Sequence, residues 1–274
     1  MKVILQELST PALVNAIEAN LFDFFIQFSH WPRAELHDDP DLLWLTSDIV
    51  HPLFNSCLRQ RFSSDDVDAT IETTIARYRA INMPTLWYIG PTTTPADLGA
   101  RLTQHGFIGQ GEAAGMAADL NDLNEDIPIP PGFTIEKVID TAKLRTWSRP
   151  VAVAFEMPDF VIDALIELYD PHGVGAGMPL DNYVGWLDGE PVASSSVYYG
   201  AGVAGIYNVA TVPEARRKGI GALMTLTPLL EARSAGYRAG ILHSSEMGAN
   251  VYRRLGFQEY CSIEHYAWLP RQEE

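Results

Sequence analysis

Residues Val209 to Met224 read VATVPEARRKGIGALM: a β-rich run, a proline turn, a basic loop with two glycines, and the start of an apolar helix. Gly219 and Gly221 lack the Cβ atoms that would keep a phosphate away from the backbone. Unpaired N–H groups at the helix start can therefore point at an anion. Arg216 to Lys218 add positive charge at the same place. The segment predicts a cradle for a pyrophosphate.

The spacing of this loop is Arg216-x-x-Gly219-x-Gly221, which is neither GxGxxG nor GxxxxGK[ST]. It resembles the acyl-CoA loop of the GCN5-related N-acetyltransferases (GNAT), where Gln/Arg-x-x-Gly-x-Gly/Ala follows a strand that ends in Val-x-Pro. Here Val212-Pro213 leads into the loop. Taken alone, the hexapeptide also fits an ordinary helix start with a tight turn and a solvated basic patch.

A second motif, SSEMGANVYRRLGFQEY from Ser244 to Tyr260, follows an apolar run that reads as a strand. GNAT members carry a tyrosine four residues before a Gly-Phe pair on the corresponding helix, and here these residues are Tyr252, Gly256 and Phe257. Alone, Tyr252 could be a core tyrosine and Gly256 a helix-ending glycine. Both motifs in family order indicate the acyl-CoA N-acyltransferase fold, an α/β architecture with a mixed sheet.

The resemblance covers about Phe133 to Leu269 and implies acetyl-CoA as cosubstrate and no metal. In the family, the strand before the loop diverges from the next strand, and its backbone pairs with the pantetheine amides. Many relatives have Asn where this chain has Ser245, which can still cap the helix and donate to the cofactor. By position the resemblance assigns cofactor binding to Ala210, Thr211, Val212, Arg217, Lys218, Gly219, Ile220, Gly221, Ala222 and Ser245.

By the same resemblance, Tyr252 is the catalytic residue that donates a proton or hydrogen bond to the departing thiolate. Its ordinary pKa near 10 exceeds that of a CoA-like thiol, which suits a donor. The sequence leaves the general base open. Glu156, Asp159 and His243 are candidates, and a water chain or a partly deprotonated acceptor would make a dedicated base unnecessary.

The chain has 274 residues, which favours two domains. With 47% hydrophobic residues it can fill cores, yet it lacks an apolar run of about 18 residues, so we expect a soluble protein. Met1 to Leu5 is too short for a signal-peptide core and reads as a strand. Cys57 and Cys261 form no CxxC or metal pattern, which favours a reducing, cytoplasmic location.

The formal charge is -16, from 19 basic and 35 acidic residues. Such a charge disfavours a nucleic-acid partner and an anionic membrane surface, and it would attract a cationic amine acceptor. The histidines in the first half show no shared metal spacing.

A polar, proline-rich linker from Asn121 to Pro131 places a domain boundary, with residues 1–125 and 126–274 on its two sides. Each half ends in a strand, a short helix, a Gly-Phe pair and a final strand, which suggests an internal repeat. In the first half this helix lies within Pro95 to Phe107. Residues 1–125 lack the loop, so we predict tandem GNAT-like domains with a degenerate first half that binds no CoA.

Hydrophobic spacing predicts further elements in both halves. The expected helices are Asp65–Ala80 and two stretches within Thr141–Tyr169 broken at Pro158, and the expected strands are Thr85–Ile89, Ala113–Leu120, Thr134–Ile139, Asp181–Leu187, Glu190–Tyr199 and Gly205–Val212.

These features lead to an acetyl-CoA-dependent N-acetyltransferase that acts on an amine of a small molecule or peptide. A non-catalytic acyl-CoA sensor or scaffold is a second hypothesis, and a transferase for another acyl group is a third. The sequence identifies neither the acceptor nor the oligomeric state.

Overall fold

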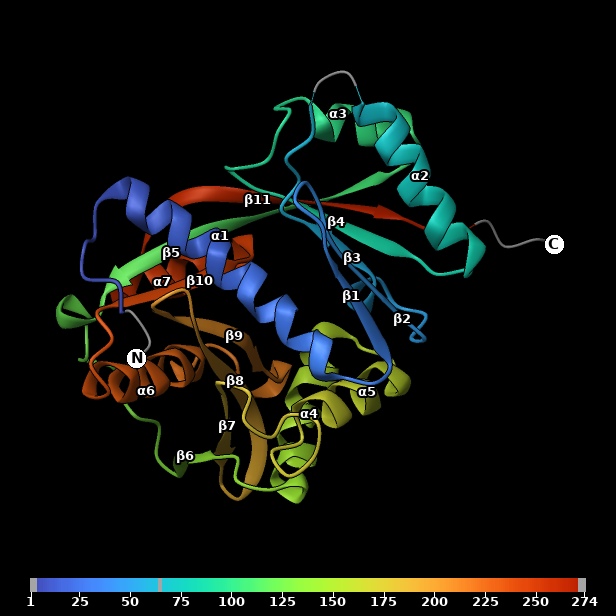
Figure 1. Ribbon diagram of the computed structural model, residues 1–274. Coiled ribbons are helices and arrows are strands. Elements are labelled where there is room, and N and C mark those ends of the chain that lie inside the picture. The colour runs from blue at the N-terminus through green and yellow to red at the C-terminus, as the bar shows by residue number, and fades with distance from the viewer. Residues whose placement is uncertain (1–3, 64–65, 271–274) are drawn as a thin grey trace. The chain divides into compact units, whose positions relative to one another are not determined.

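The computed structural model describes residues 4–63 and 66–270 (Figure 1). By contacts the chain divides into two compact units. The major unit holds the described residues up to Phe24 together with residues 114–260, and the minor unit holds those within 25–113 and 261–270. The start of the described chain thus belongs to the major unit and its end to the minor unit, so these units differ from the predicted domains 1–125 and 126–274. The predicted domains concern two related halves of the sequence, and they remain a prediction.

The major unit is built on a mixed sheet with the strand order β5-β10-β9-β8-β7-β6. β10 and β9 run parallel, and the other neighbours are antiparallel. The strands are β5 (Ile108–Asp119, of which residues 114–119 pair with β10), β6 (Phe133–Lys137), β7 (Leu180–Leu187), β8 (Glu190–Gly200), β9 (Val203–Thr211) and β10 (Ala239–Ser244).

Two tight turns join the three central antiparallel strands. Asp188 and Gly189 have φ values of 52° and 86°, and Ala201 and Gly202 have φ values of 49° and 74°. Positive φ at both central residues matches the right-handed twist of the flanking strands. The predicted antiparallel strands from Asp181 to Val212 are confirmed within a residue or two at their ends.

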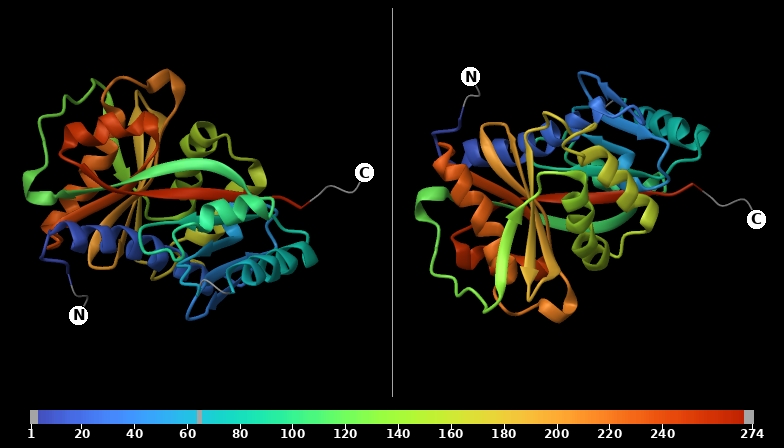
Figure 2. Two further views of the ribbon diagram at one scale, coloured as in Figure 1. Left: turned by 90° about the horizontal axis from the view of Figure 1, so that it is seen from above. Right: turned by 90° about the horizontal axis from the view of Figure 1, so that it is seen from below.

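Helices pack on both faces of this sheet, α4 on one face of β8 and β9 and α6 on the other (Figure 2). Pro158 separates α4 from α5, as predicted. Asp140 caps α4 by accepting a hydrogen bond from the Lys143 N–H at 2.7 Å. The helices are α1 (Thr10–Ile26, in the major unit up to residue 24), α4 (Thr141–Phe155), α5 (Asp159–Tyr169), α6 (Ile220–Ser234) and α7 (Glu246–Leu255).

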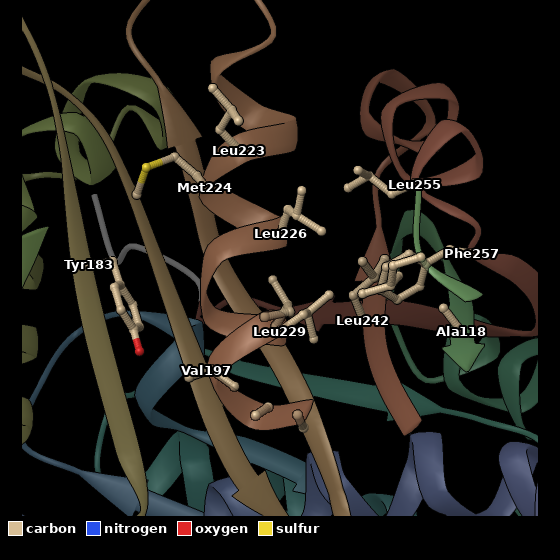
Figure 3. Close-up of a cluster of buried hydrophobic side chains, with 14 of the residues drawn as sticks. Ala118, Tyr183, Val197, Leu223, Met224, Leu226, Leu229, Leu242, Leu255 and Phe257 are labelled. Atoms are coloured by element: carbon tan, nitrogen blue, oxygen red, sulfur yellow. The ribbon is translucent and has the colours of Figure 1, made fainter. Parts of the chain in front are cut away.

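Helix α6 forms the centre of the major core (Figure 3). Its Met224 and Leu229 are fully buried, and the cluster also holds Val197 of β8 and Phe257 beyond α7. A helix that is apolar on most sides must be covered on most sides. Burial of α6 therefore fixes where its N-terminus, and the loop before it, can lie.

The minor unit contains five neighbouring strands in the order β1-β2-β3-β4-β11. Its core surrounds Trp87, which contacts Phe107 with ring centroids 5.6 Å apart. The elements are β1 (Ala34–Asp38), β2 (Leu43–Ser47), β3 (Ser56–Leu58), α2 (Val67–Ala80), β4 (Thr85–Ile89), α3 (Leu98–Gln104) and β11 (Gln258–Trp268, in the minor unit from residue 261). The predicted strand Thr85–Ile89 is confirmed; the predicted helix start at Asp65 lies outside the described residues.

The strand predicted for Met1 to Leu5 is wrong where it can be checked. Residues 1–3 lie outside the described residues, and residues 4–9 form no helix or strand. The Leu5 N–H donates to the Gly202 carbonyl at 3.0 Å, and a single bond of this kind does not make a ladder. Among the described residues, no helix is long and apolar enough to cross a membrane.

Candidate functional site

The candidate site lies where β9 and β10 separate. These strands pair only from Gly240↔Ala204 to Leu242↔Ile206. Beyond Ile206, β9 continues along β8 as far as Thr211 but no longer pairs with β10. The next stretch of β9 therefore has one free backbone edge, which can pair with an extended ligand. The predicted divergence of the strand before the loop is present.

The loop after β9 is held in place by its own backbone and by Arg216. The guanidinium Nε of Arg216 donates to the Thr211 carbonyl at 3.0 Å, which gives this arginine a structural contact. Arg217 and Gly219 adopt positive φ values of 63° and 80°. Helix α6 then starts at Ile220 with Gly219 as its N-cap.

This geometry leaves the backbone of the loop open to a ligand. Among the described residues, the N–H groups of residues 217–221 have no hydrogen-bond acceptor in the protein. A Cβ built on Gly221 would meet only the Thr211 Oγ1, at 3.9 Å. Packing thus does not explain this glycine, whereas space for an anion at a helix N-terminus does.

A cleft of about 640 Å³ opens between the free part of β9, the loop, α7 and the end of α4. Every residue predicted for the site lines it except Val212 and Lys218. The prediction missed further lining residues, among them Ile127, Phe155, Met247, Val251 and Arg254. The last three follow at i, i+4 and i+7 on α7, so helical periodicity could have placed them on one face with the cleft.

Tyr252 belongs both to the cleft and to the edge of the major core. Ser245 positions its helix by accepting a hydrogen bond from the Gly248 N–H at 3.4 Å, as the sequence predicted for a cap. The ring lies 6.1 Å from that of Phe257. Burial raises the pKa of Tyr252 to about 12, so the phenol is neutral and can donate at physiological pH.

None of the three candidate bases is among the residues that line the cleft. Glu156 is exposed and ends α4 in a left-handed conformation, and Asp159 is exposed in the first turn of α5. His243 follows the last residue of β10 that pairs with β9, and its ring lies 6.2 Å from that of Tyr207. Within the described parts of the chain, no cluster of three His, Cys, Asp or Glu side chains could hold a metal.

Comparison with known proteins agrees with this geometry. Residues 181–259 match the model of the acetyltransferase (GNAT) domain. No curated protein sequence matches the chain.

Solved structures share the fold over nearly the full length. A GCN5-related N-acetyltransferase from Kribbella flavida is 19% identical, with 92% of this chain and 95% of that chain covered and a TM-score of 0.70. A tandem GNAT protein from the clavulanic acid biosynthesis pathway is 14% identical, with 99% of both chains covered and a TM-score of 0.63. A GCN5-related N-acetyltransferase from Sphaerobacter thermophilus is 17% identical, with 97% and 94% covered and a TM-score of 0.63.

At these identities the solved structures establish the fold, and the domain match covers the segment that supplies most, but not all, of the cleft lining. Residues 181–259 belong to the GNAT acetyltransferase family, and the chain as a whole has the fold of tandem GNAT proteins.

Proposed function

We propose that the chain is an acetyl-CoA-dependent N-acetyltransferase whose active site is the cleft between β9 and α7. One observation carries the proposal: a single cleft brings together an unpaired row of loop N–H groups, a free strand edge and a neutral tyrosine. An anion cradle, a pairing edge and a proton donor are what an acyl-CoA and its departing thiol require.

The fit of acetyl-CoA follows the length of the cleft. The N–H groups of residues 217–221 and the Arg217 guanidinium would hold the pyrophosphate, with Lys218 beside them; the Ala222 N–H donates to the Gly219 carbonyl at 3.1 Å. The edge of β9 that faces away from β8, at residues 210 and 211, would pair with the pantetheine amides, whereas the Val212 N–H already donates to the Val192 carbonyl at 2.9 Å. Ser245, which lines the cleft, would offer its hydroxyl to a cosubstrate carbonyl.

The reaction forms an amide C–N bond and breaks the thioester C–S bond. The neutral amine attacks the carbonyl carbon and gives up one proton, and the CoA sulfur takes up one proton as it leaves. Tyr252 supplies the hydrogen bond or proton for the sulfur, because a phenol is protonated at physiological pH and burial raises the pKa of this one further. The amine proton passes to solvent water, since none of the candidate bases lines the cleft.

The absence of a base from the cleft lining favours one alternative, a non-catalytic acyl-CoA sensor or scaffold. A transferase for another acyl group would use the same cradle. We also propose a cytoplasmic protein without nucleic-acid, membrane or metal partners, whose first half, residues 1–125, binds no CoA. A charge of -16 suits a cationic amine acceptor.

The test is release of free CoA by the full chain from acetyl-CoA in the presence of amines, polyamines, aminoglycosides, amino acids and peptides. We expect at least one amine class to give turnover and one acetyl-CoA to bind per chain. Saturable acetyl-CoA binding without turnover on any amine would favour the sensor. Absence of acetyl-CoA binding would refute both.

A further inference from the structure

Strand β9 contains a bulge at the point where the cleft begins. Ser194 of β8 pairs with Ala210, and Ser196 pairs with Tyr207, so β9 holds one more residue than β8 in this interval. Asn208 takes up the extra length with a φ of 53°. Few residues other than glycine adopt this left-handed conformation, and asparagine is among those that tolerate it best.

Buried side chains hold this bulge from behind. The Ser194 Oγ donates to the Asn208 carbonyl at 3.1 Å, and the Asn208 Nδ2 donates to the Ser196 Oγ at 3.1 Å. The Ser196 Oγ in turn donates to the Asn182 Oδ1 of β7 at 2.6 Å. Ser194 and Ser196 are fully buried, and Asn182 is 5% exposed. The Ser196 hydroxyl is thus the central link, because it both accepts and donates.

The bulge lies where it can determine which backbone groups of β9 face the cleft. It lies between Ile206, the last β9 residue that pairs with β10, and Val209 and Ala210, which line the cleft. A slip of one residue in a strand turns every following side chain and peptide group to the opposite direction. The conformation of Asn208 therefore sets which backbone groups of residues 209–211 face the cleft.

We propose that the hydrogen-bonded chain Asn182–Ser196–Asn208 positions the β9 backbone against the acyl carbonyl. The inference rests on the proposed function, and it adds three positioning residues, none of which is among the residues that line the cleft. In this arrangement the loop governs affinity for acetyl-CoA, and the bulge governs the orientation of the thioester for attack. Displaced backbone groups would lower kcat, because orientation within a bound complex contributes directly to the rate of the chemical step.

The chain offers a matched control one residue from the central link. Ser195 is also fully buried, but among the described residues its Oγ has no hydrogen-bond partner. Ser195→Ala and Ser196→Ala remove the same atom from adjacent positions of the same strand. Only the second change breaks this hydrogen-bonded link, and it removes the partner of the buried Asn182 Oδ1 and of the half-buried Asn208 Nδ2.

The experiment compares Ser196→Ala, Ser195→Ala, Asn208→Ala and Asn208→Gly in the full chain. It measures kcat with a working amine, acetyl-CoA affinity by calorimetry, and amide hydrogen exchange in a peptide that spans residues 205–212. We expect Ser196→Ala and Asn208→Ala to lower kcat about tenfold or more, with affinity within about threefold and faster exchange. Asn208→Gly should lose less than Asn208→Ala, because glycine retains the left-handed backbone. Ser195→Ala should match the unmodified chain.

Equal kcat and equal exchange in the Ser196 and Ser195 variants would overturn the proposal. A loss of kcat accompanied by an equal loss of acetyl-CoA affinity would also overturn it, because the Asn182–Ser196–Asn208 hydrogen bonds would then support binding of the cosubstrate and not its orientation. If the unmodified chain turns over no amine, the proposed function fails separately. In that case, amide hydrogen exchange in residues 205–212 still decides whether the Asn182–Ser196–Asn208 hydrogen bonds fix the bulge. If Ser196→Ala does not fold, the two Asn208 variants carry the same comparison.

Discussion

Two helices of this molecule, α7 of the major unit and α3 of the minor unit, end in the same way. Gly256 and Gly106 follow them with positive φ values of 107° and 88°. The next residues, Phe257 and Phe107, are each 2% exposed. Both helices thus close with a left-handed glycine and an apolar plug, which is a general way to stop a helix at a core.

The equivalence extends to the helix residue whose carbonyl accepts a hydrogen bond from the N–H of each phenylalanine. The Phe257 N–H donates to the Tyr252 carbonyl at 3.1 Å, and the Phe107 N–H donates to the Leu102 carbonyl at 3.0 Å. Leu102 therefore occupies the position of Tyr252, yet it is fully buried while Tyr252 lines a cleft. The Gly-Phe ending belongs to the fold. The phenol, and the phosphate loop that residues 1–125 lack, belong to the proposed activity.

Gly221→Asp should have the largest effect on acetyl-CoA affinity. A carboxylate in the cradle would meet the bound phosphates with a like charge, so acetyl-CoA affinity should fall about a hundredfold or more. The variant should fold, because a side chain at this position meets only Thr211. Calorimetry with the full chain checks both statements.

Two controls separate charge and location in that experiment. Gly221→Ala fills part of the same space without charge and should weaken binding less. Gly109→Asp adds the same charge in the minor unit, where a Cβ meets only Tyr266 at 3.9 Å, and should leave affinity unchanged. Normal binding by Gly221→Asp would reduce the loop to a turn, and loss of binding by Gly109→Asp would break the contrast between the units.

Leu102→Ala tests the other side of the comparison. Because Leu102 is fully buried, its truncation should lower the free energy of unfolding by about 2–5 kcal/mol. Tyr252→Phe removes one hydroxyl at the edge of the core and should lower it by less than about 1 kcal/mol. Denaturant unfolding of both variants measures the difference. Similar losses would mean that the two positions serve the same purpose.

Tyr252→Phe should instead act on turnover. Loss of a positioned donor should lower kcat by about ten- to a thousandfold while acetyl-CoA affinity stays nearly constant. Tyr237→Phe is the control, since Tyr237 lies in the major unit but not among the cleft-lining residues. An unchanged kcat in Tyr252→Phe would leave this residue as a core tyrosine.

The raised pKa of Tyr252 adds a pH test of the same role. With a folded pKa of about 12, the phenol stays protonated as the pH rises through 10, where an ordinary tyrosine ionises. Activity should therefore show no loss from this group between pH 7 and about pH 10. A loss with a midpoint near pH 10 that disappears in Tyr252→Phe would show that the phenol is not desolvated.

The sequence predicted the parts of the fold in which local and tertiary signals agree. Strands flanked by turn residues, the break at Pro158 and the caps at Ser245 and Gly256 all have short-range causes, and each is found in the structure. Helix α1 was not predicted, although it spans Thr10–Ile26. Its apolar residues occur on most sides, so it shows little of the periodicity that identifies a surface helix.

The site was predictable only as far as its motifs reach. Gly219, Gly221 and Tyr252 stand at spacings that identify them, and the structure brings them to one cleft. Phe155 lies on a different helix, and the bulge at Asn208 depends on serines of the neighbouring strand. Such contacts arise from strand pairing and helix packing, which one linear sequence does not specify.

Arg254→Ala should have the smallest effect, and it compares two neighbouring residues of α7. Arg254 lines the cleft, and among the described residues it has no ion pair, whereas Arg253 pairs with Glu259 at 3.2 Å and lies outside the cleft lining. An exposed guanidinium near a phosphate contributes modestly, so acetyl-CoA affinity should weaken about three- to tenfold, and less in high salt. The Arg253→Ala variant should bind acetyl-CoA normally.

Calorimetry of the Arg254→Ala variant with CoA and 3′-dephospho-CoA locates the contact. A smaller loss of affinity for the dephosphorylated ligand assigns Arg254 to the 3′-phosphate, and an equal loss assigns it to the pyrophosphate. If Arg253→Ala weakens binding as much as Arg254→Ala, the cleft does not discriminate between them and the effect is one of general surface charge.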